Sequence, residues 1–339
     1  MPPAYQGKVC SMNLKTHKPV LCAGDLLPDL ILPYGNAKEY LQSVRAGIKP
    51  GEKSALVRVL CGGSGGNTAV GVAKLGVPSM MASKAGRDYQ GKMLGDDLTA
   101  KGVDASYVMW DDENPTMLTL VVTDETGDRY MFAWPDNGSA HMNMLPEELP
   151  DELIAKIGWV NISGMVLRSN PTGATLTDFA ERCAAAGVHV SIDLNLHTET
   201  FGWAEEYSSR IRRVMEVSTV IFGSLGEEFS FVCDHPKDLV RENRMIVARE
   251  GKDGCTLYTA EGDYSVGIYD LKVADTVGAG DCFNSGFISA AVLGMSPRDC
   301  LVWGNACGNY SVQFEGGHTC PDRETLLKFI AEHGVPEKR

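Results

Sequence analysis

The second half of the chain alternates short apolar runs of strand length with longer runs of helical spacing. Helices are indicated where apolar residues recur three and four positions apart, and strands by continuous apolar runs rich in valine and isoleucine. The predicted strands cover 159–163, 188–193, 219–222, 245–249, 255–259 and 264–268, and the predicted helices cover 172–186, 203–217, 281–293, 297–313 and 322–333. Because strands that alternate with helices pair in parallel, the pattern predicts an α/β fold with a mostly parallel central sheet and helices on both faces.

The first half of the chain does not follow this alternation. Extended runs are predicted at 20–26, 29–32 and 55–60, a helix at 65–76, a hairpin at 117–134, and a polar loop at 34–55. These short extended segments predict a small β-sheet lid, inserted near 27–33, 54–61 and 116–134. We expect one domain over 18–333, an N-terminal tail at 1–17 and a C-terminal tail at 334–339.

Composition narrows the function classes. The 339 residues are 44% hydrophobic and carry a formal charge of −13, with no run of lysine and arginine. Nucleic acid and anionic membranes are therefore not expected as partners. The apolar runs are too broken to span a membrane, and the N-terminus has no apolar signal segment, so a cytoplasmic protein is expected. The ten cysteines form no CxxC pair and the seven histidines no zinc pattern, which indicates reduced core thiols.

The stretch DTVGAGD, residues 275–281, places glycines immediately before a predicted helix and Asp281 at its start. An isolated aspartate at a helix start is usually a cap. Here the glycines allow several backbone amides to converge, and the helix dipole adds positive potential, so the segment predicts an anion cradle. A carboxylate beside bound phosphate is useful if it takes the proton of a hydroxyl that attacks the phosphate. The pattern therefore predicts phosphoryl transfer, with Asp281 as the base.

Two segments resemble the signatures of the PfkB carbohydrate kinases, the ribokinase-like family: residues 274–293, around DTVGAGD, and residues 62–91, beginning GGSGGNTAVG. The resemblance implies a ribokinase-like three-layer α/β/α sandwich and transfer of phosphate from ATP. It implies that Asp281 is the catalytic base and that the amides of Gly278, Ala279 and Gly280 form the anion hole. In the other segment, it implies a hinge between lid and core at Gly62 and Gly63, and contacts with the sugar from Gly63 and Asn67.

The resemblance implies further ligands. Asp29 is expected to bind sugar hydroxyls, with Asp25 as the competing acid. Ser224 stands where the family has the asparagine of an N-x-x-E motif linked to Mg²⁺, and Glu227 keeps the acidic position, acting directly or through water; the adjacent Glu228 is expected to be an exposed helix residue. The implied ATP contacts are Thr276, Gly251, Gly254 and Asn305, with Gly308 on the same helix as Asn305. Asp275 is implied as a ligand of a monovalent cation such as K⁺.

The acceptor is less well specified. Some relatives have an arginine for a substrate carboxylate where this chain has His197, which disfavours a sugar acid unless Arg168 replaces it. The hairpin aromatics Tyr130, Phe132 and Trp134 are candidates either for the sugar pocket or for the lid core. We therefore expect transfer from MgATP to the primary hydroxyl of a ribose-like or fructose-like sugar. A nucleoside kinase of the same family and a catalytically silent sugar-binding protein are the alternatives, and a homodimer through the lid is expected.

Overall fold

The structure is a computed structural model that describes residues 13–33, 38, 45, 58–123, 129–135 and 138–338. Three predicted segments fall largely outside the described residues. They are the loop at 34–55, the start of the extended run at 55–60 and the turn of the predicted hairpin. Of the predicted N-terminal tail, residues 13–17 are described. There the backbone amide of Thr16 donates a hydrogen bond to the carbonyl of Val292, and Leu14 is buried.

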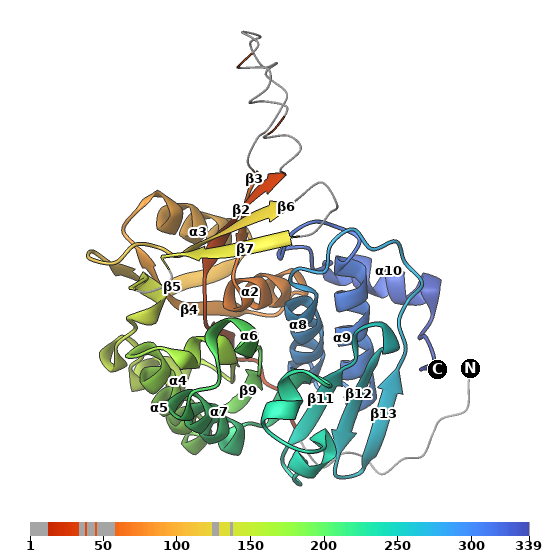
Figure 1. Cartoon of the computed structure of the whole chain (residues 1–339). Coiled ribbons are helices and arrows are strands. Elements are labelled where there is room, and N and C mark those ends of the chain that lie inside the picture. Colours follow the sequence, from red (N-terminus) through yellow and green to blue (C-terminus); the bar gives the residue numbers. More distant parts are fainter. Residues whose placement is uncertain are drawn as a thin grey trace.

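A nine-stranded sheet forms the centre of the molecule (Figure 1). Its strands, in spatial order, are β13 (Gly262–Val266), β12 (Cys255–Thr259), β11 (Met245–Arg249), β10 (Val220–Ser224), β9 (His189–Asp193), β8 (Trp159–Ser163), β1 (Val20–Ala23), β4 (Ser79–Gly86) and β5 (Val103–Asp111). All neighbours from β11 to β5 pair in parallel, whereas β12 and β13 are antiparallel. The prediction of a mostly parallel sheet is confirmed.

Helices cover both faces of this sheet (Figure 1). They are α2 (Ser64–Lys74), α3 (Tyr89–Ala100), α4 (Asp151–Lys156), α5 (Thr172–Ala185), α6 (Thr198–Phe201), α7 (Glu205–Val217), α8 (Ala279–Val292), α9 (Pro297–Ser311) and α10 (Arg323–His333). One apolar core lies between the sheet and α2, α3, α8, α9 and α10, and a second lies between the opposite face and α4, α5 and α7. The result is the predicted three-layer α/β/α sandwich.

Sequence patterns missed three consecutive elements, β4, α3 and β5. Strand β4 is buried along its whole length although it contains Ser79, Ser83 and Lys84, so it shows neither alternation nor a continuous apolar run. The amine of Lys84 is satisfied by Glu148 at 2.8 Å and by a backbone carbonyl. Helix α3 has a recognisable start, because the Asp88 carboxylate accepts a hydrogen bond from the Gly91 amide.

A separate sheet of four strands lies beside the carboxyl ends of β1 and its neighbours (Figure 1). In spatial order these are β3 (Arg58–Gly62), β2 (Leu27–Pro33), β6 (Leu118–Thr123) and β7 (Arg129–Trp134). Strands β6 and β7 pair in antiparallel register, which confirms the predicted hairpin. The predicted small sheet therefore exists, and its opening and closing as a lid remains a prediction.

The order of the strands in the large sheet indicates where a ligand-binding site is expected. Strand β1 lies between β4 and β8, so the chain builds the sheet outward from β1 in both directions. In open α/β sheets, ligands bind beyond the carboxyl ends of the strands at such a reversal point. The small sheet begins at that edge too, because β2 starts four residues after β1 ends. Functional side chains are therefore expected where the carboxyl ends of these strands face the small sheet.

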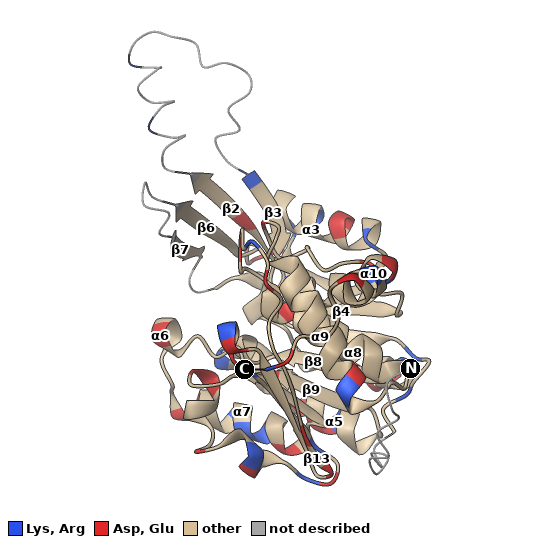
Figure 2. Cartoon of the chain, turned by 90° about the vertical axis from the view of Figure 1, so that its right-hand side faces the viewer, with Lys and Arg blue, Asp and Glu red and all other residues tan. Residues whose placement is uncertain are grey.

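The charged side chains on the surface are mixed in sign, as expected from a sequence without a run of lysine and arginine. Lysine and arginine alternate with acidic residues along the helices, as with Lys92, Asp96, Asp97 and Lys101 on α3 (Figure 2). Among the described helices, none combines the length and the apolar character that crossing a membrane requires. None of the nine described cysteines forms a disulfide, and no cluster of three potential metal ligands occurs in the described part of the chain.

Candidate active site

The first turn of α8 is built around a glycine with left-handed backbone. Gly278 has φ +73°, and a side chain there would place its Cβ 2.7 Å from the Cα of Gly317. The first backbone amides of a helix have no partner inside it, so those of residues 278–281 are free of the helical hydrogen-bond ladder. That of Ala279 is 3.2 Å from the carbonyl of Thr276. The amides of Gly280 and Asp281 thus remain the best placed to bind an anion.

Asp281 lies in this first turn and its carboxylate is held at both oxygens. Oδ1 accepts a hydrogen bond from Ser64 Oγ at 2.7 Å, and Oδ2 accepts one from Asn67 Nδ2 at 2.8 Å. Burial raises the pKa of Asp281 to about 7, with Asp193 and Asp25 adding to the rise and the two hydrogen bonds opposing it. A carboxyl with a pKa near neutrality suits a general base, because it is ionised enough to act and basic enough to accept a proton.

The start of α2 brings Ser64 and Asn67 to this position. Gly63 has φ +88°, and a Cβ on it would lie 2.6 Å from the carbonyl oxygen of Asp25, so only glycine fits. Gly62 ends β3 of the small sheet and Ser64 begins α2, so the glycine pair joins the small sheet to α2. Asn67 Oδ1 is buried without a hydrogen-bond partner among the described residues and faces Gly317. It is free to accept a hydrogen bond from a ligand.

Both candidate sugar-binding acids lie beside this junction. Asp25 is 3% exposed; its Oδ2 accepts a hydrogen bond from the Ser64 amide at 2.8 Å, and its Oδ1 has no partner in the described part of the protein. Asp29 lies on β2, and burial raises its pKa to about 6, against a hydrogen bond with Thr119 that lowers it. A Cβ on Gly62 would lie 2.7 Å from Asp29 Oδ2. The two carboxylates thus flank the glycine pair, and the sequence prediction named Asp29 first.

Three strand ends near the start of α8 supply a polar cluster, of which the sequence prediction named Ser224 but missed Asp193 and Arg249. Asp193, Ser224 and Arg249 are the last residues of β9, β10 and β11. The Arg249 guanidinium donates to both oxygens of Asp193, at 2.6 and 3.1 Å. The signal was available in the sequence, because polar residues that end neighbouring parallel strands meet at one edge of a sheet.

Glu227 and Glu228 are oriented differently from the prediction. Glu228 was expected to be exposed, but its Oε2 accepts a 2.6 Å hydrogen bond from the Ser224 amide and lies 3.6 Å from Arg249 Nη2. Burial raises the pKa of Glu228, and Arg249 opposes that rise. Glu227, the predicted Mg²⁺ ligand, is exposed at this edge. The turn after β10 therefore directs Glu228, rather than Glu227, into the cluster.

The predicted ATP contacts lie further along the same edge. Gly251 and Gly254, with φ +55° and +98°, form the turn between β11 and β12. Asn305, on α9, is linked to this turn by Cys255, whose thiol lies 3.6 Å from Asn305 Oδ1. The Asn305 amide nitrogen donates to the Gly267 carbonyl at 2.9 Å, so its side chain has a structural role in the protein. Gly308 packs against the carbonyl of Ala279 at the start of α8.

Asp275 is buried behind the glycine turn, whereas Thr276 is exposed. Asp275 Oδ1 accepts a hydrogen bond from the Val277 amide at 3.0 Å, and Oδ2 accepts one from the Gly316 amide at 3.1 Å. These bonds join the DTVGAGD segment to the loop after α9. That loop also positions Gly317 against Asn67 and Gly278. The residues predicted around the anion hole are thus brought together, with Asp275 as a support from behind.

His197 and Arg168, the two residues considered for binding an acidic substrate, lie in different surroundings. His197 has left-handed backbone, with φ +47°, and its exposed ring lies 3.4 Å from Glu199. Arg168 follows β8, next to the end of β1, and its guanidinium stacks 3.8 Å above the Phe201 ring. Burial lowers the pKa of Arg168, and the nearby Tyr207 and Asp25 oppose the change. Among the described residues, none forms a hydrogen bond or ion pair with this guanidinium.

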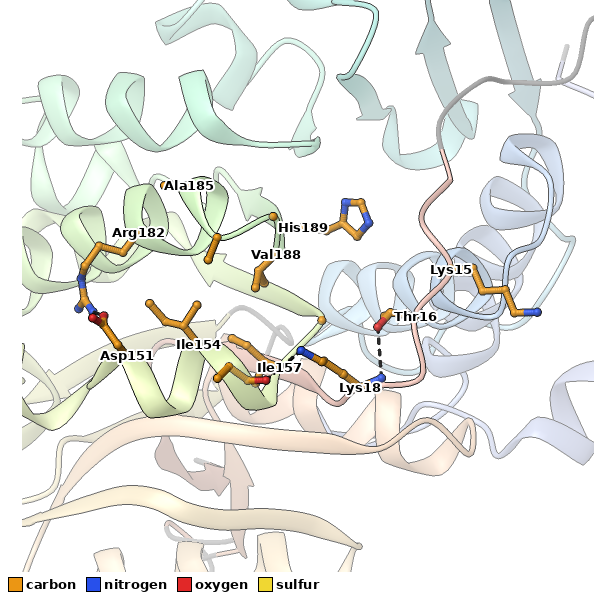
Figure 3. Close-up of a pocket in the computed structure, with 14 residues that line it drawn as sticks. Lys15, Thr16, Lys18, Asp151, Ile154, Ile157, Arg182, Ala185, Val188 and His189 are labelled. Carbon is orange, nitrogen blue, oxygen red and sulfur yellow. Dashed lines mark hydrogen bonds and ion pairs between the residues drawn. The ribbon is translucent and has the colours of Figure 1, made fainter.

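A cavity of about 690 Å³ lies elsewhere in the molecule (Figure 3). Its lining includes Gly158 and Val188, which precede β8 and β9, so it opens at the amino ends of the strands, opposite Asp281. Arg182 is paired with Asp151 at one rim, and Lys18 donates to the Ala155 carbonyl at 2.9 Å. Because it lies at the opposite ends of the strands, the cavity is separate from the candidate active site. Arg182 and Lys18, two cationic residues of its lining, already have protein partners.

Comparison with known proteins defines the class and then the family. The fold is ribokinase-like: a putative ribokinase II from E. coli, solved in complex with ATP and Mg²⁺, superposes with a TM-score of 0.80 over 93% of this chain and 100% of its own, at 21% identity. The model of the "pfkB family carbohydrate kinase" matches residues 37–324. The chain belongs to this family, and it is a phosphotransferase that acts on a sugar hydroxyl.

Two curated relatives extend the comparison. A probable fructokinase-7 from Arabidopsis thaliana is 31% identical over 333 residues, covering 92% of this chain and 93% of its own. A 5-dehydro-2-deoxygluconokinase from Geobacillus thermodenitrificans is 26% identical over 297 residues, covering 84% and 87%. The two names specify different acceptors, one a neutral sugar and the other a sugar acid.

Proposed function

We propose that the chain transfers the γ-phosphate of MgATP to the primary hydroxyl of a small sugar, with Asp281 as the base. The observation that carries the proposal is the state of Asp281: a carboxylate with a pKa near 7, held at both oxygens, in the first turn of a helix that begins with a left-handed glycine. A base placed beside an anion cradle can activate a hydroxyl while the cradle stabilises the charge of the transferred group.

In this mechanism the sugar binds between the start of α2 and the small sheet, beside Asp25, Asn67 and Asp29. The Oδ1 atoms of Asp25 and Asn67 are buried acceptors without partners in the described part of the chain, and they would receive hydrogen bonds from sugar hydroxyls. Asp29, on the small sheet, would receive another. Closure about Gly62 and Gly63 would then bring β2 and β3 over the sugar and exclude water. Asp281 would take the proton from the primary hydroxyl as that oxygen attacks the phosphate.

The phosphate side uses backbone amides. Those of Gly278 and Gly280, together with that of Asp281, would stabilise the charge on the transferred group, whereas the amide of Ala279 already donates to the Thr276 carbonyl. The exposed Thr276 and the turn at Gly251 and Gly254 would lie on the nucleotide side. The described residues hold no cluster of three potential metal ligands. This fits Mg²⁺, which keeps several waters and binds mainly through ATP phosphates, leaving Glu227 as a contact through water. Bound there, the metal would neutralise charge on the phosphate oxygens.

A monovalent cation is a further proposal at Asp275. The carboxylate is 5% exposed and lies between the DTVGAGD segment and the loop after α9. A K⁺ ion beside it would add positive charge behind the anion hole. We expect kcat to increase when K⁺ replaces a large organic cation in the assay buffer. An unchanged kcat would contradict this part of the proposal.

The leading acceptors are ribose-like or fructose-like sugars, supported by the likeness to the probable fructokinase from Arabidopsis thaliana. A sugar acid is the second candidate, and Arg168 is the observation in its favour. A half-buried guanidinium without a hydrogen-bonded partner is costly unless a ligand supplies an anion. Its place after β8, next to the end of β1, would allow it to meet a carboxylate on the sugar.

The test is ADP release with MgATP and a panel of acceptors: ribose, fructose, tagatose, 2-keto-3-deoxygluconate, 5-dehydro-2-deoxygluconate, adenosine and inosine. Turnover of a neutral sugar supports the first candidate. If a sugar acid is preferred, Arg168→Gln should raise its KM while leaving that of fructose unchanged. Turnover with nucleosides alone would contradict both sugar candidates, and no ADP release with any acceptor would contradict the proposed reaction.

A homodimer through the small sheet is the final part of the proposal. Strands β3 and β7 are the edges of that sheet, and on β7 the side chains of Phe132 and Trp134 are 57% and 60% exposed. Unpaired edges and exposed aromatic residues favour association. Sedimentation velocity should show a dimer that Phe132→Lys shifts toward monomer. A wild-type monomer at high concentration would contradict this.

A further inference from the structure

Arg249 approaches the first turn of α8 more closely than its role in a salt bridge requires. A Cβ built on Gly280 would lie 2.8 Å from Arg249 Nη1, so the guanidinium rests against the Gly280 backbone. The absence of a side chain at residue 280 is what leaves room for it. Arg249 side-chain exposure is 15%, so the cation is largely removed from solvent.

This placement is electrostatically unusual. The amino end of a helix carries partial positive charge and normally attracts carboxylates, whereas cations favour the other end. Burial alone would lower the pKa of Arg249, but Asp193 and Glu228 raise it above its usual value, so the guanidinium stays charged. A permanent cation therefore lies against the positive end of a helix, close enough to Asp281 for the charge of that carboxylate to act on Arg249.

The partners of Arg249 orient it without using all its donors. Nη1 and Nη2 donate to Asp193, Nη1 lies 3.4 Å from Asn284 Oδ1, and Nη2 lies 3.6 Å from Glu228 Oε2. A guanidinium has five N–H groups in a rigid planar fork. Asn284 in turn donates to Asp193 at 2.7 Å, which fixes the carboxylate. The arrangement holds the fork in one orientation and uses both hydrogens of Nη1. Nε–H, which lies 4.0 Å from a Cβ built on Gly280, has no hydrogen-bond partner among the described residues and is the donor available for a further ligand.

From this geometry we propose that Arg249 contacts the phosphoryl group in transfer, donating to its oxygens from the side of Gly280, while Asp193 and Glu228 act as positioning residues. The inference rests on the proposed function, because it assumes that the γ-phosphate lies over the first turn of α8. The transferred group gains no bond to arginine. The sugar oxygen forms the new P–O bond, the bond to ADP breaks, and the hydroxyl proton goes to Asp281.

The alternative is that Arg249 only neutralises Asp193. Single variants do not separate the two roles, since removing the cation leaves a carboxylate beside the phosphate in either case. The double variant Arg249→Gln/Asp193→Asn does separate them, because it removes both charges, leaves a polar side chain at residue 249 and keeps the shape of residue 193. A neutralising role predicts that the double variant recovers most of the kcat lost in Arg249→Gln. A phosphate contact predicts that it does not.

The experiment compares wild type, Arg249→Gln, Arg249→Lys and the double variant, with Arg244→Gln as the matched control. Arg244 is a buried arginine that immediately precedes β11, at the end opposite Arg249, and it donates to the carbonyls of Glu216 and Ser218. We expect Arg249→Gln to lower kcat by about 10²–10³-fold, the typical loss for one donor to developing charge. ATP affinity should stay within a few-fold, and Arg244→Gln should leave kcat unchanged.

A second readout does not depend on turnover. ADP with aluminium fluoride imitates the phosphoryl group in transfer, and its binding should weaken more in Arg249→Gln than the binding of ATP does. Equal weakening of both, recovery of kcat in the double variant, or a kcat within a few-fold of wild type in folded Arg249→Gln would each overturn the assignment. If wild type phosphorylates no acceptor, the proposed function fails, and the aluminium fluoride comparison still decides the phosphate contact.

Discussion

Ser64 connects the two acids of the site: its hydroxyl donates a 2.7 Å hydrogen bond to Asp281 Oδ1, and its backbone amide donates a 2.8 Å hydrogen bond to Asp25 Oδ2. Ser64 follows Gly63 directly, at the junction of the small sheet and α2. The proposed base is therefore held by the segment about which the small sheet is proposed to move. Its ionisation and orientation should depend on this contact.

Activity should rise with pH through the titration of Asp281. The pKa of its carboxyl is raised to about 7, mainly by burial, and a general base acts only when ionised. The acid limb of kcat/KM should therefore have its midpoint near pH 7. Ser64→Ala removes a donor to the ionised form, so the midpoint should move to higher pH. An acid limb near pH 4, or one that Ser64→Ala does not shift, would contradict the assignment.

Replacing the base should affect catalysis far more than binding. Asp281→Asn keeps the shape and both side-chain neighbours but cannot accept the hydroxyl proton. We expect kcat to fall by about 10²–10⁴-fold, the usual contribution of a positioned base. The dissociation constant of ATP, measured by calorimetry, should stay within a few-fold. Near-normal turnover by a folded Asp281→Asn variant would show that another group accepts the proton.

The same titration predicts how stability depends on pH. The pKa of Asp281 is higher in the folded protein than its ordinary value of 3.8, so the folded state binds the proton more tightly. The contribution to stability is complete below pH 3.8 and is lost as pH rises through about 7. Asp281→Asn should therefore raise Tm relative to wild type at pH 8, with a difference that shrinks toward pH 4. A constant difference across this range would contradict the raised pKa.

Close helix packing should make one glycine irreplaceable and another dispensable. A Cβ on Gly286, in α8, would lie 2.5 Å from the Trp303 carbonyl oxygen of α9, whereas one on Gly95, in α3, would meet nothing closer than 3.8 Å. Gly286→Ala should destabilise the protein by about 1–3 kcal/mol through overpacking. Gly95→Ala should stabilise it by about 0.5–1 kcal/mol, because alanine favours the helix. Chemical denaturation measures both, and equal effects would contradict the packing described.

The local sequence determined most of the elements and part of the chemistry. Apolar periodicity predicted the strands and, except for the short α6, the α-helices from residue 159 onward, because each of these elements carries the spacing of its own buried face. The glycines before Asp281 and those before Asn67 predicted their turns, since left-handed backbone and close approach require glycine at Gly278 and Gly63. Those two segments also carry the family likeness that the comparison with known proteins confirmed.

Only the tertiary structure decided which distant residues meet. Strand β4 is buried through pairing on both sides and a lysine neutralised by Glu148, a partner 64 positions away, so no local pattern marks it. The inward orientation of Glu228 depends on Ser224 and Arg249, and the guanidinium reaches α8 only because Gly280 leaves space. The order of strands in the sheet brings these groups together. Chain periodicity reports which side of an element is buried, whereas strand order and packing determine what it is buried against.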